Sequence, residues 1–362
     1  MRRLIFTLHL YAGLGSGLLL ALIGVTGSLL VFYPQLDQWL TPALTTPAST
    51  ATPLPLQDIL SRASDAVDGA EPRRLYLPGT SGDYHLVRFD TPPDAPGPLQ
   101  VNVDPYTGEV AAVRTWGAYP MTWIYRLHYT LLAGTTGKYV VGVCGILLAL
   151  FAVTGVYLRW PKRGRWRRAL AIERGKGRFR FYFDLHGALG LYLFPVLMVV
   201  ALSGVFMVFR APITSAVATL ATVTPAPNPR SAPSASTPVT LDQAVTAAAP
   251  VFPGARLSRV YLPRSQRDSY RLAYVLPESN WQRYAASSVW VDQYSGEILE
   301  VWDERKLGAA DTVLAWQFPL HNGEALGLPG RWLVFVSGGL PALLFVTGVY
   351  LWWRKRRLKR RR

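Results

Sequence analysis

The feature that most constrains this chain is a set of four long apolar runs. They occupy residues 4–33, 139–158, 181–209 and 332–353, and each reaches the roughly 20 residues that a helix needs to cross a hydrocarbon core of about 30 Å. Because lipid offers the backbone no hydrogen-bond partners, single segments of this kind cross as helices and not as strands. We therefore expect four transmembrane helices. The alternative is a set of buried helices in a large soluble protein, and four such runs together argue against it.

The positive charge of the chain is concentrated beside these runs. The formal net charge is +16, yet residues 2–3, 159–180 and 354–362 contain 20 of the 38 lysines and arginines, and the rest of the chain is close to neutral. Basic flanks at the start, the middle and the end match the positive-inside rule for four spans. The charge thus predicts cytoplasmic amino and carboxyl termini and two long loops outside, and it does not favour nucleic acid as a partner.

The first apolar run has two interpretations, a cleaved signal peptide or a retained anchor. The run is longer than a typical signal-peptide core, and no small-x-small cleavage site follows it promptly, so we expect an anchor. The single cysteine, Cys144, lies inside the second run. One cysteine excludes internal disulfides, Cys-ligated iron–sulfur clusters and the attachment motif of c-type haem.

The sequence contains an internal repeat, because three blocks recur in the same order in its two halves. The matched blocks are 74–78 with 259–263, 103–109 with 291–297, and 153–158 with 346–351, the last pair being identical. The repeating unit is therefore a helix, a soluble domain and a second helix, first over about 1–165 and again over about 177–362.

Each soluble domain shows the same local signals. A linker rich in Pro, Thr, Ala and Ser comes first, and such composition predicts a flexible or extended segment. A short helix and alternating strand segments follow. Asp104 and Asp292 then open turns that contain Gly108 and Gly296, where positive φ is permitted. The expected elements are linkers 41–55 and 224–240, helices 56–66 and 241–249, and strands 84–89, 99–103, 270–275 and 289–291.

The expected fold class is an α-helical membrane protein with four transmembrane helices, internal duplication and two outer α+β domains. The predicted order is transmembrane helix 1 (1–36), outer domain 1 (37–118), a short outer-face helix with transmembrane helix 2 (119–160), a basic cytoplasmic loop (161–180), transmembrane helix 3 (181–211), a linker with outer domain 2 (212–310), a short outer-face helix with transmembrane helix 4 (311–353), and a basic cytoplasmic tail (354–362).

Four of the five histidines occupy matched places in the two halves. His9 and His186 lie near the cytoplasmic ends of the first and third runs, and His128 and His321 precede the second and fourth. Ionisable residues at membrane depth are costly and mark function by default, and imidazole is a common axial ligand of haem iron. The fifth histidine, His85, has no histidine counterpart, so we expect it to be a surface or core residue.

Glycines and basic residues accompany these histidines at fixed spacings. Gly13 and Gly190 follow the inner histidines by four residues, which places them on the same helix face. A porphyrin lying against a helix needs such a lack of side chain. Glycines at 134 and 137, and at 327 and 330, follow the outer histidines, and Lys138 and Arg331 come next. These two cations are expected either to meet haem propionates or to anchor the helices at the interface.

The duplication supplies one histidine from each half to each of two sites. We expect His9 to pair with His186 on the inner side, and His128 with His321 on the outer side, each pair binding the iron of one non-covalent haem b. Pairing within each half would place the ligands at opposite membrane faces, roughly 35 Å of helix apart. The alternative is that the histidines are structural and the glycines serve helix packing. Zinc fits poorly, because no carboxylate or thiolate accompanies the histidines at ligand spacing.

The position of His128 poses a geometric question. It precedes the second span by ten residues, which a continuous helix would turn into about 15 Å beyond the interface. The glycines at 134 and 137 offer a break, so residues 123–133 form either a short helix folding back over the bundle or an extension of the span. The sequence leaves both arrangements open.

Motifs along nearly the whole chain resemble those of the PepSY-associated transmembrane family, which includes iron-regulated inner-membrane proteins and ferric-siderophore reductases. The motifs are residues 8–9 with 24–27, 127–128 through 154–155 and 160–163, 184–186, and 319–323 through 347–348. The outer domains resemble PepSY domains that end in an Asp-x-Tyr-Thr/Ser-Gly-Glu turn. One departure is Ser203 in the third span, where the family pattern has threonine, and we expect this change to affect packing more than ligation.

The resemblance implies a di-haem b-type oxidoreductase of the bacterial inner membrane that passes electrons to a periplasmic ferric-siderophore, in iron uptake. The longest cytoplasmic loop has about 20 residues and no dinucleotide-binding motif, so a separate flavin- or NAD(P)H-linked donor is required. The alternative is a non-redox protein whose PepSY-like domains bind or regulate an envelope peptidase or ligand. A transporter ranks last, because we expect no buried acid and no broken helix within the spans.

Overall fold

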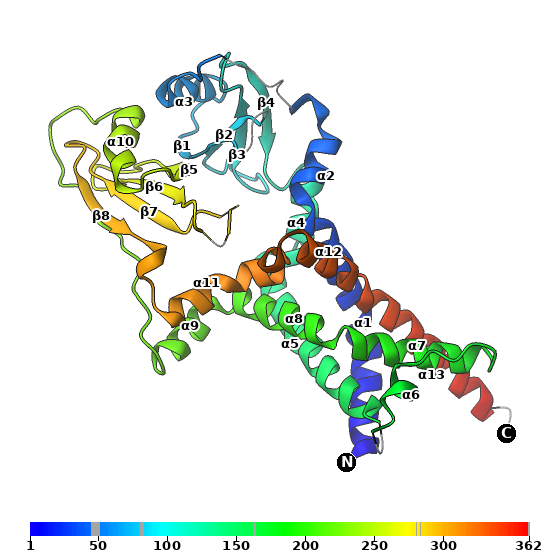
Figure 1. Cartoon of the computed structure of the whole chain (residues 1–362). Coiled ribbons are helices and arrows are strands. Elements are labelled where there is room, and N and C mark those ends of the chain that lie inside the picture. Colours follow the sequence, from blue (N-terminus) through cyan, green and yellow to red (C-terminus); the bar gives the residue numbers. More distant parts are fainter. Residues whose placement is uncertain (45–50, 80–82, 162–163, 280, 283, 361–362) are drawn as a thin grey trace. The chain divides into compact units, whose positions relative to one another are not determined.

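The chain forms two compact units in the computed structural model. The structure describes residues 1–44, 51–79, 83–161, 164–279, 281–282 and 284–360. The membrane unit comprises Met1–Tyr33, Ile124–Thr222 and Thr312–Arg362, and the sheet unit comprises Pro34–Trp123 and Val223–Asp311 (Figure 1). Part of the first predicted linker (45–50), part of the Trp-Pro-Lys-Arg motif (162–163) and the end of the basic tail (361–362) lie outside the described residues.

The membrane unit is helical throughout its described elements. Its helices are α1 (Arg2–Val31), α4 (Pro120–Thr130, which begins in the sheet unit), α5 (Gly134–Arg159), α6 (Trp166–Leu170), α7 (Arg178–Tyr192), α8 (Phe194–Val208), α9 (Arg210–Ala218), α11 (Ala309–His321, which also begins in the sheet unit), α12 (Gly327–Gly338) and α13 (Leu340–Arg360). A 3-10 turn, η5 (Glu324–Leu326), joins α11 to α12.

Three stretches of the described chain are long and apolar enough to cross a membrane. They are α1, α5 and the 37-residue stretch Glu324–Arg360 that contains α12 and α13. A fourth crossing exists if α7 and α8 count as one span, but these helices meet at an angle of 61°. The expectation of an unbroken third helix is therefore wrong. Pro195 in the first turn of α8 explains the break, because proline lacks the N–H donor and its ring clashes with the preceding turn.

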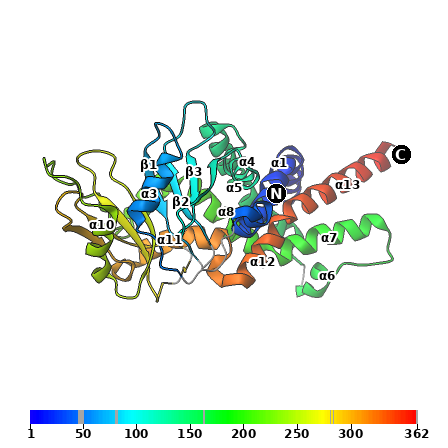
Figure 2. The ribbon, with the colours of Figure 1, turned by 90° about the horizontal axis from the view of Figure 1, so that it is seen from above.

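Helices from the two halves of the chain pack against each other in the membrane unit. Helix α1 lies against α5, α12 and α13, while α5 also lies against α8, and α7 lies against α13 (Figures 1 and 2). A Cβ atom on Gly24 would lie 2.3 Å from the carbonyl oxygen of Gly338, and Ser28 donates to the Phe335 carbonyl at 2.7 Å. Small residues thus allow α1 and α12 to approach closely, as in many membrane helix pairs.

The helices that carry the outer histidines are separate from the spans that follow them. Helix α4 ends at Thr130, and the chain reverses through Leu131 and Leu132, whose φ angles are positive. A Cβ atom on Gly137 would lie 1.7 Å from the carbonyl oxygen of Thr130, and one on Gly330 would lie 2.1 Å from that of Gly323. These two glycines let α4 and α11 turn back against the first turns of α5 and α12. Of the two arrangements that the sequence left open, the structure has the short separate helix.

The sheet unit contains one antiparallel sheet of eight strands. The strand order is β4-β3-β2-β1-β5-β6-β7-β8, so β1 and β5 join the two halves of the chain at the centre. Leu75 of β1 pairs with Val260 of β5. The strands are β1 (Pro72–Tyr76), β2 (His85–Phe89), β3 (Leu99–Val103), β4 (Val110–Thr115), β5 (Arg256–Tyr261), β6 (Tyr270–Val275), β7 (Ser287–Val291) and β8 (Ile298–Trp302).

Both halves also share one hydrophobic core on one face of this sheet. Helices α3 (Leu56–Asp65) and α10 (Leu241–Ala248) cover that face and bury Ile59 and Leu241 against strand residues such as Val87 and Leu272 (Figures 1 and 2). The carboxylate of Asp242 accepts the backbone N–H groups of residues 56 and 57 at 2.8 and 2.9 Å, which caps α3 from the other half of the chain. The two predicted outer domains are thus two halves of one folded unit.

Several local expectations for the sheet unit are confirmed. The predicted helices and strands are present within two residues of the expected bounds. Asp104 accepts the backbone N–H groups of the two following turn residues, Asp292 does the same, and Gly108 and Gly296 have φ angles of 72° and 74°. The remaining elements before β1 are α2 (Tyr33–Leu40) and η1 (Pro42–Leu44). Short 3-10 turns, η3 (Ala249–Val251) and η4 (Glu304–Lys306), follow α10 and β8.

His85 is a core residue of the sheet unit. It begins β2, its side chain faces the core and it is 4% exposed. Its Nδ1 atom is buried and has no hydrogen-bond partner among the described residues. Burial lowers the pKa of His85 to about 4, because the charged imidazolium loses its hydration.

The buried His85 predicts a specific pH dependence of stability. The unfolded chain takes up this proton near pH 6.5 and the folded chain only near pH 4, so stability falls as the pH is lowered through that window. Replacing His85 with Gln should flatten the dependence by up to about 1.4 kcal/mol per pH unit. Thermal unfolding of both proteins in detergent between about pH 4.5 and about pH 7.5 measures the difference. Parallel curves for the two proteins would show that His85 does not contribute.

Candidate functional site

Four histidines of the membrane unit lie in two pairs. The rings of His128 and His321 face each other with centroids 6.2 Å apart and planes inclined by 53°. His9 and His186 occupy corresponding places at the inner ends of the helices, His9 against Thr154 of α5 and His186 against Thr347 of α13. The structure thus brings together one histidine from each half of the chain at each of two places.

A hydroxyl group on the neighbouring span holds each inner histidine. His9 Nδ1 lies 2.8 Å from Thr154 Oγ1 on α5, and His186 Nδ1 lies 2.8 Å from Thr347 Oγ1 on α13. Each threonine hydroxyl donates its proton to a carbonyl of its own helix. The hydroxyl oxygen therefore accepts from the imidazole, which places the ring proton on Nδ1 and leaves Nε2 with a lone pair.

A backbone carbonyl holds each outer histidine in the same tautomer. His128 Nδ1 donates to the Ile23 carbonyl at 2.9 Å, and His321 Nδ1 donates to the Val200 carbonyl at 2.9 Å. A carbonyl oxygen only accepts, so Nδ1 carries the proton in both rings. In the part of the chain that the structure describes, Nε2 of all four histidines makes no hydrogen bond.

The hydroxyl residue beside each outer histidine is followed by a glycine. Thr26 lies 3.2 Å from His128 Nδ1, and a Cβ atom on Gly27 would lie 2.8 Å from His128 Cε1. Ser203 lies 3.2 Å from His321 Nδ1, and Gly204 gives a corresponding distance of 3.0 Å. These glycines make room for the imidazole against the helix. Ser203 keeps the hydroxyl contact that Thr26 makes in the other half, so its departure from threonine removes only a methyl group.

The glycines beside the inner histidines lie farther from the imidazole rings than those beside the outer histidines. A Cβ atom on Gly155 would lie 3.7 Å from His9 Cε1, and one on Gly348 would lie 3.6 Å from His186 Cε1. These distances are ordinary van der Waals contacts. Each Thr-Gly or Ser-Gly pair therefore places a polar atom at Nδ1 and backbone beside Cε1, with tighter contacts at the outer pair.

The two histidine pairs lie at different depths along α1. His9 is in its second turn, and the outer His128 contacts Ile23 and Thr26 near its other end. The 17 residues between His9 and Thr26 correspond to roughly 25 Å of helix, close to the thickness of a hydrocarbon core. One continuous helix therefore connects the two sites.

The predicted glycines and cations around the histidines have different environments. No described side chain or neighbouring backbone lies within 4 Å of the position that a Cβ atom on Gly13 or Gly190 would take. Arg331 donates to the Val31 carbonyl at 2.8 Å and stacks over Phe32. It thereby provides a hydrogen-bond donor to the last backbone carbonyl of α1. Lys138 is half-buried in the first turns of α5.

One charged group of the membrane unit was missed by sequence reasoning. Asp184 is fully buried in α7, two residues before His186, and its carboxylate accepts from Arg159 at 3.1 Å and from Arg180 at 2.7 Å. The expectation that no span carries a buried acid is therefore wrong. The sequence did hold a signal, because Asp184 is the one acidic residue within the third apolar run. Paired arginines make the burial of this charge tolerable.

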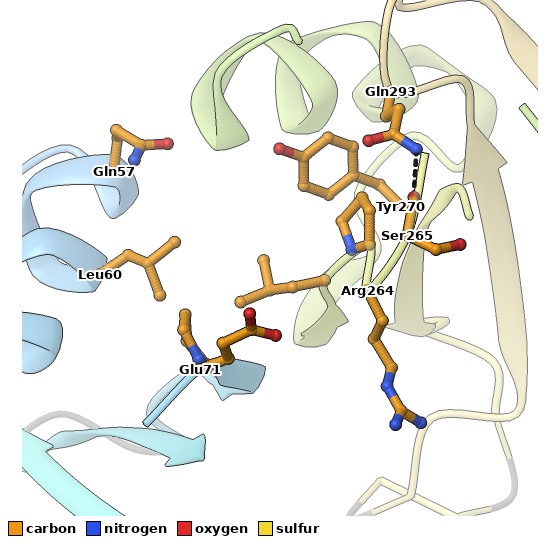
Figure 3. Close-up of a pocket in the computed structure, with 10 residues that line it drawn as sticks. Gln57, Leu60, Glu71, Arg264, Ser265, Tyr270 and Gln293 are labelled. Atoms are coloured by element: carbon orange, nitrogen blue, oxygen red, sulfur yellow. Dashed lines mark hydrogen bonds between the residues drawn. The ribbon is translucent and has the colours of Figure 1, made fainter. Parts of the chain in front are cut away.

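The sheet unit has a cavity of about 400 Å³ between α3 and the second half of the sheet. Gln57 and Leu60 of α3 line one side, and Tyr270 and Gln293 line the other (Figure 3). Gln293 donates to the Ser265 carbonyl at 2.9 Å, so its amide is used within the wall. The cavity contains neither a pair of catalytic carboxylates nor a histidine, and among the described residues no three His, Cys, Asp or Glu side chains gather to hold a metal ion.

Comparison with known proteins assigns the family. The chain matches the model of the PepSY-associated TM region over residues 6–355. It is also 33% identical over 84 residues to an uncharacterized protein of Pseudomonas aeruginosa, a stretch that covers 22% of this chain and 20% of that relative. The chain thus spans about a fifth of the length of the curated relative that it matches. The family match extends from α1 into α13, and the chain belongs to the PepSY-associated transmembrane family.

Proposed function

We propose that this protein is a di-haem b-type electron carrier of the bacterial inner membrane that reduces a periplasmic ferric-siderophore. In this proposal α7 and α8 together form one crossing, giving four spans. The termini are cytoplasmic, as the basic flanks indicate, and the sheet unit is periplasmic. The single observation that carries the proposal is the arrangement of the four imidazoles.

The residues present suit an iron porphyrin. All four imidazoles have their proton on Nδ1, and a fixed Nδ1–H with a free Nε2 is the usual state of a metal-ligating histidine. Two metal–nitrogen bonds of about 2 Å each, together with the two ring radii, span about 6 Å. The observed separation of the outer ring centroids is 6.2 Å. His128 and His321 would hold one haem, and His9 and His186 would hold the other.

The surroundings of the histidines support the same assignment. Gly13 and Gly190 leave open space on the helix faces that carry the inner histidines. Lys138, half-buried in the first turns of α5, would be the cation for a haem propionate, because Arg331 is engaged by the Val31 carbonyl. Bound haem iron would supply one-electron chemistry by cycling between its ferric and ferrous states. The chain itself fixes the imidazoles and keeps the two sites a helix length apart.

The overall reaction transfers one electron to the iron of a ferric-siderophore, giving the ferrous complex. Oxygen ligands hold ferrous iron less tightly than ferric iron, so reduction favours release. The electron is supplied by a separate cytoplasmic flavin- or NAD(P)H-linked reductase. The basic segments beside α5, α7 and α13 lie at the cytoplasmic ends of the helices in this topology.

Loss of one histidine should remove one haem and leave the other. Purified wild-type protein should contain two haem b per chain by pyridine haemochrome assay and show sharp visible bands that shift on reduction with dithionite. Replacing His9 or His186 with Ala should leave one haem, and replacing His128 or His321 with Ala should leave the other, with a different reduction potential. The matched control is His85→Ala, which removes a buried histidine of the sheet unit and should leave both haems.

The outcome that contradicts the pairing is the survival of both haems after any of the four replacements. Loss of both haems in every variant, with unchanged helix content, would contradict the separation of the two sites. A colourless wild-type preparation that is folded and inserted in membranes would contradict the redox function, and would favour a non-redox PepSY protein that binds or regulates an envelope component.

Gly27 and Gly155 lie at different distances from their histidine rings, so replacing each with alanine should have different effects. A Cβ atom at position 27 would lie 2.8 Å from His128 Cε1 and must displace the ring, whereas one at position 155 would lie 3.7 Å from His9 Cε1. Gly27→Ala should therefore reduce occupancy of the outer haem severalfold, and Gly155→Ala should keep the inner haem. Haem content and reduction potential measure both effects. Equal haem retention in the two variants would show that the close contact of Gly27 with His128 does not position the imidazole ring.

A further inference from the structure

The face of the sheet opposite α3 and α10 is lined by arginine and tyrosine side chains. Core residues alternate with these side chains along each strand, as in any sheet with one covered face. Leu75 of β1 and Val260 of β5, for example, are fully buried in the core. We call the opposite surface over the four central strands the arginine face, and it consists of Arg74, Tyr76, Arg88, Arg259, Tyr261 and Arg271.

Strand register places these residues side by side. Arg74 of β1 lies directly opposite Arg88 of β2 on one side and Tyr261 of β5 on the other. Tyr261 in turn lies opposite Arg271 of β6, and Tyr76 lies opposite Arg259. Like charges at directly opposite positions destabilise a sheet. A pair such as Arg74 and Arg88 therefore calls for a compensating negative charge.

The described chain supplies no such charge. No carboxylate of the described residues lies within ion-pair distance of Arg74, Arg88, Arg259 or Arg271. Other arginines of the sheet unit do have acidic partners, as Arg114 has in Asp37 at 3.2 Å. What distinguishes the arginine face is that four half-buried arginines without a carboxylate partner lie together on it.

Two guanidinium nitrogens of this face are also buried without a partner. The Nε atoms of Arg74 and Arg259 occupy equivalent positions in the two halves, and each lacks a hydrogen bond among the described residues. Burial acts to raise the pKa of the Tyr76 phenol, but the neighbouring guanidinium groups of Arg74 and Arg88 outweigh it and lower that pKa. The local electrostatic field at Tyr76 is therefore positive.

Aromatic rings separate the arginines and hold them in place. The Arg74 guanidinium lies 4.2 Å from the centre of the Tyr261 ring, and that of Arg271 lies 5.1 Å from Tyr261 and 4.9 Å from Trp290. Stacking of this kind orients a guanidinium while its N–H groups remain donors. A cavity of about 180 Å³, lined in part by Tyr261, Arg271 and Trp290, adjoins the face within the sheet unit.

We propose that the arginine face binds an anionic, aromatic oxygen ligand and that, on the function proposed above, this ligand is a ferric catecholate complex. Such a complex carries net negative charge on its oxygens and presents aromatic rings, which match the guanidinium groups and the interleaved tyrosines. A ferric hydroxamate complex is neutral or cationic and matches neither feature. The inference rests on the proposed function for the identity of the ligand, and on the charge of the face for its class.

The test separates binding from electron transfer by using gallium in place of iron. Gallium(III) tris-catecholate has the charge and shape of the ferric complex but is not reduced under these conditions. It is titrated into the full-length protein in neutral detergent, and binding is followed by calorimetry and tryptophan fluorescence. We expect saturable binding of the catecholate and at least tenfold weaker binding of gallium tris-hydroxamate.

Paired variants locate the site. Arg74→Gln with Arg259→Gln should weaken catecholate binding at least tenfold. The matched control, Arg264→Gln with Arg267→Gln, removes the same charge from exposed positions of the sheet unit and should change binding less than twofold. Arg88→Gln with Arg271→Gln provides a second pair on the face if the first fails to fold, as judged by circular dichroism and the thermal unfolding midpoint.

Three results would overturn the proposal. These are equal binding of the catecholate and hydroxamate complexes, equal losses in the face and control variants, and binding of phosphatidylglycerol vesicles through these arginines without binding of the catecholate. Failure of this proposal is distinguishable from failure of the proposed function. Protein with two haems that does not bind the gallium catecholate contradicts only the former, and colourless protein that binds it through the face contradicts only the latter.

Discussion

An imidazole has two ring nitrogens, and the described part of the membrane unit offers a hydrogen-bond partner to only one of them at each of four half-buried histidines. Threonine hydroxyls or backbone carbonyls occupy Nδ1 of His9, His186, His128 and His321. The same nitrogen is engaged at all four matched places, which leaves the other ring nitrogen of each histidine available to a ligand. This constraint explains the Thr-Gly and Ser-Gly pairs, the short helices α4 and α11, and the glycines that let those helices fold back.

Gene duplication accounts for how the two halves of the fold cooperate. Each half contributes one histidine to each pair, one set of four strands to the common sheet, and one helix to the common core. The halves have nevertheless diverged. The buried Asp184 with its arginines has no acidic counterpart beside His9, where Thr7 occupies the equivalent position two residues earlier. The two histidines of the inner pair therefore have different electrostatic surroundings.

Sequence reasoning recovered the elements whose signals are local, and missed those set by contacts between the halves. The turns at Asp104 and Asp292, the helices α3 and α10 and the apolar spans follow from composition and spacing, because each depends on residues near in sequence. The joining of β1 to β5 and the shared core depend on residues about 185 positions apart, such as Leu75 and Val260, which periodicity does not relate. The positions of the histidines were predicted by symmetry, but their Nδ1 partners were not, since hydroxyls and carbonyls are too common to single out.

The most direct test of this account is the iron content and iron K-edge X-ray absorption spectrum of the purified full-length protein. The account predicts two irons per chain, each surrounded by nitrogen atoms at about 2 Å, with no sulfur ligand and with imidazole scattering beyond the first shell. Iron-free protein, a single iron per chain, or a first shell containing sulfur or mainly oxygen would contradict the claim that paired imidazoles hold two iron porphyrins in this bundle.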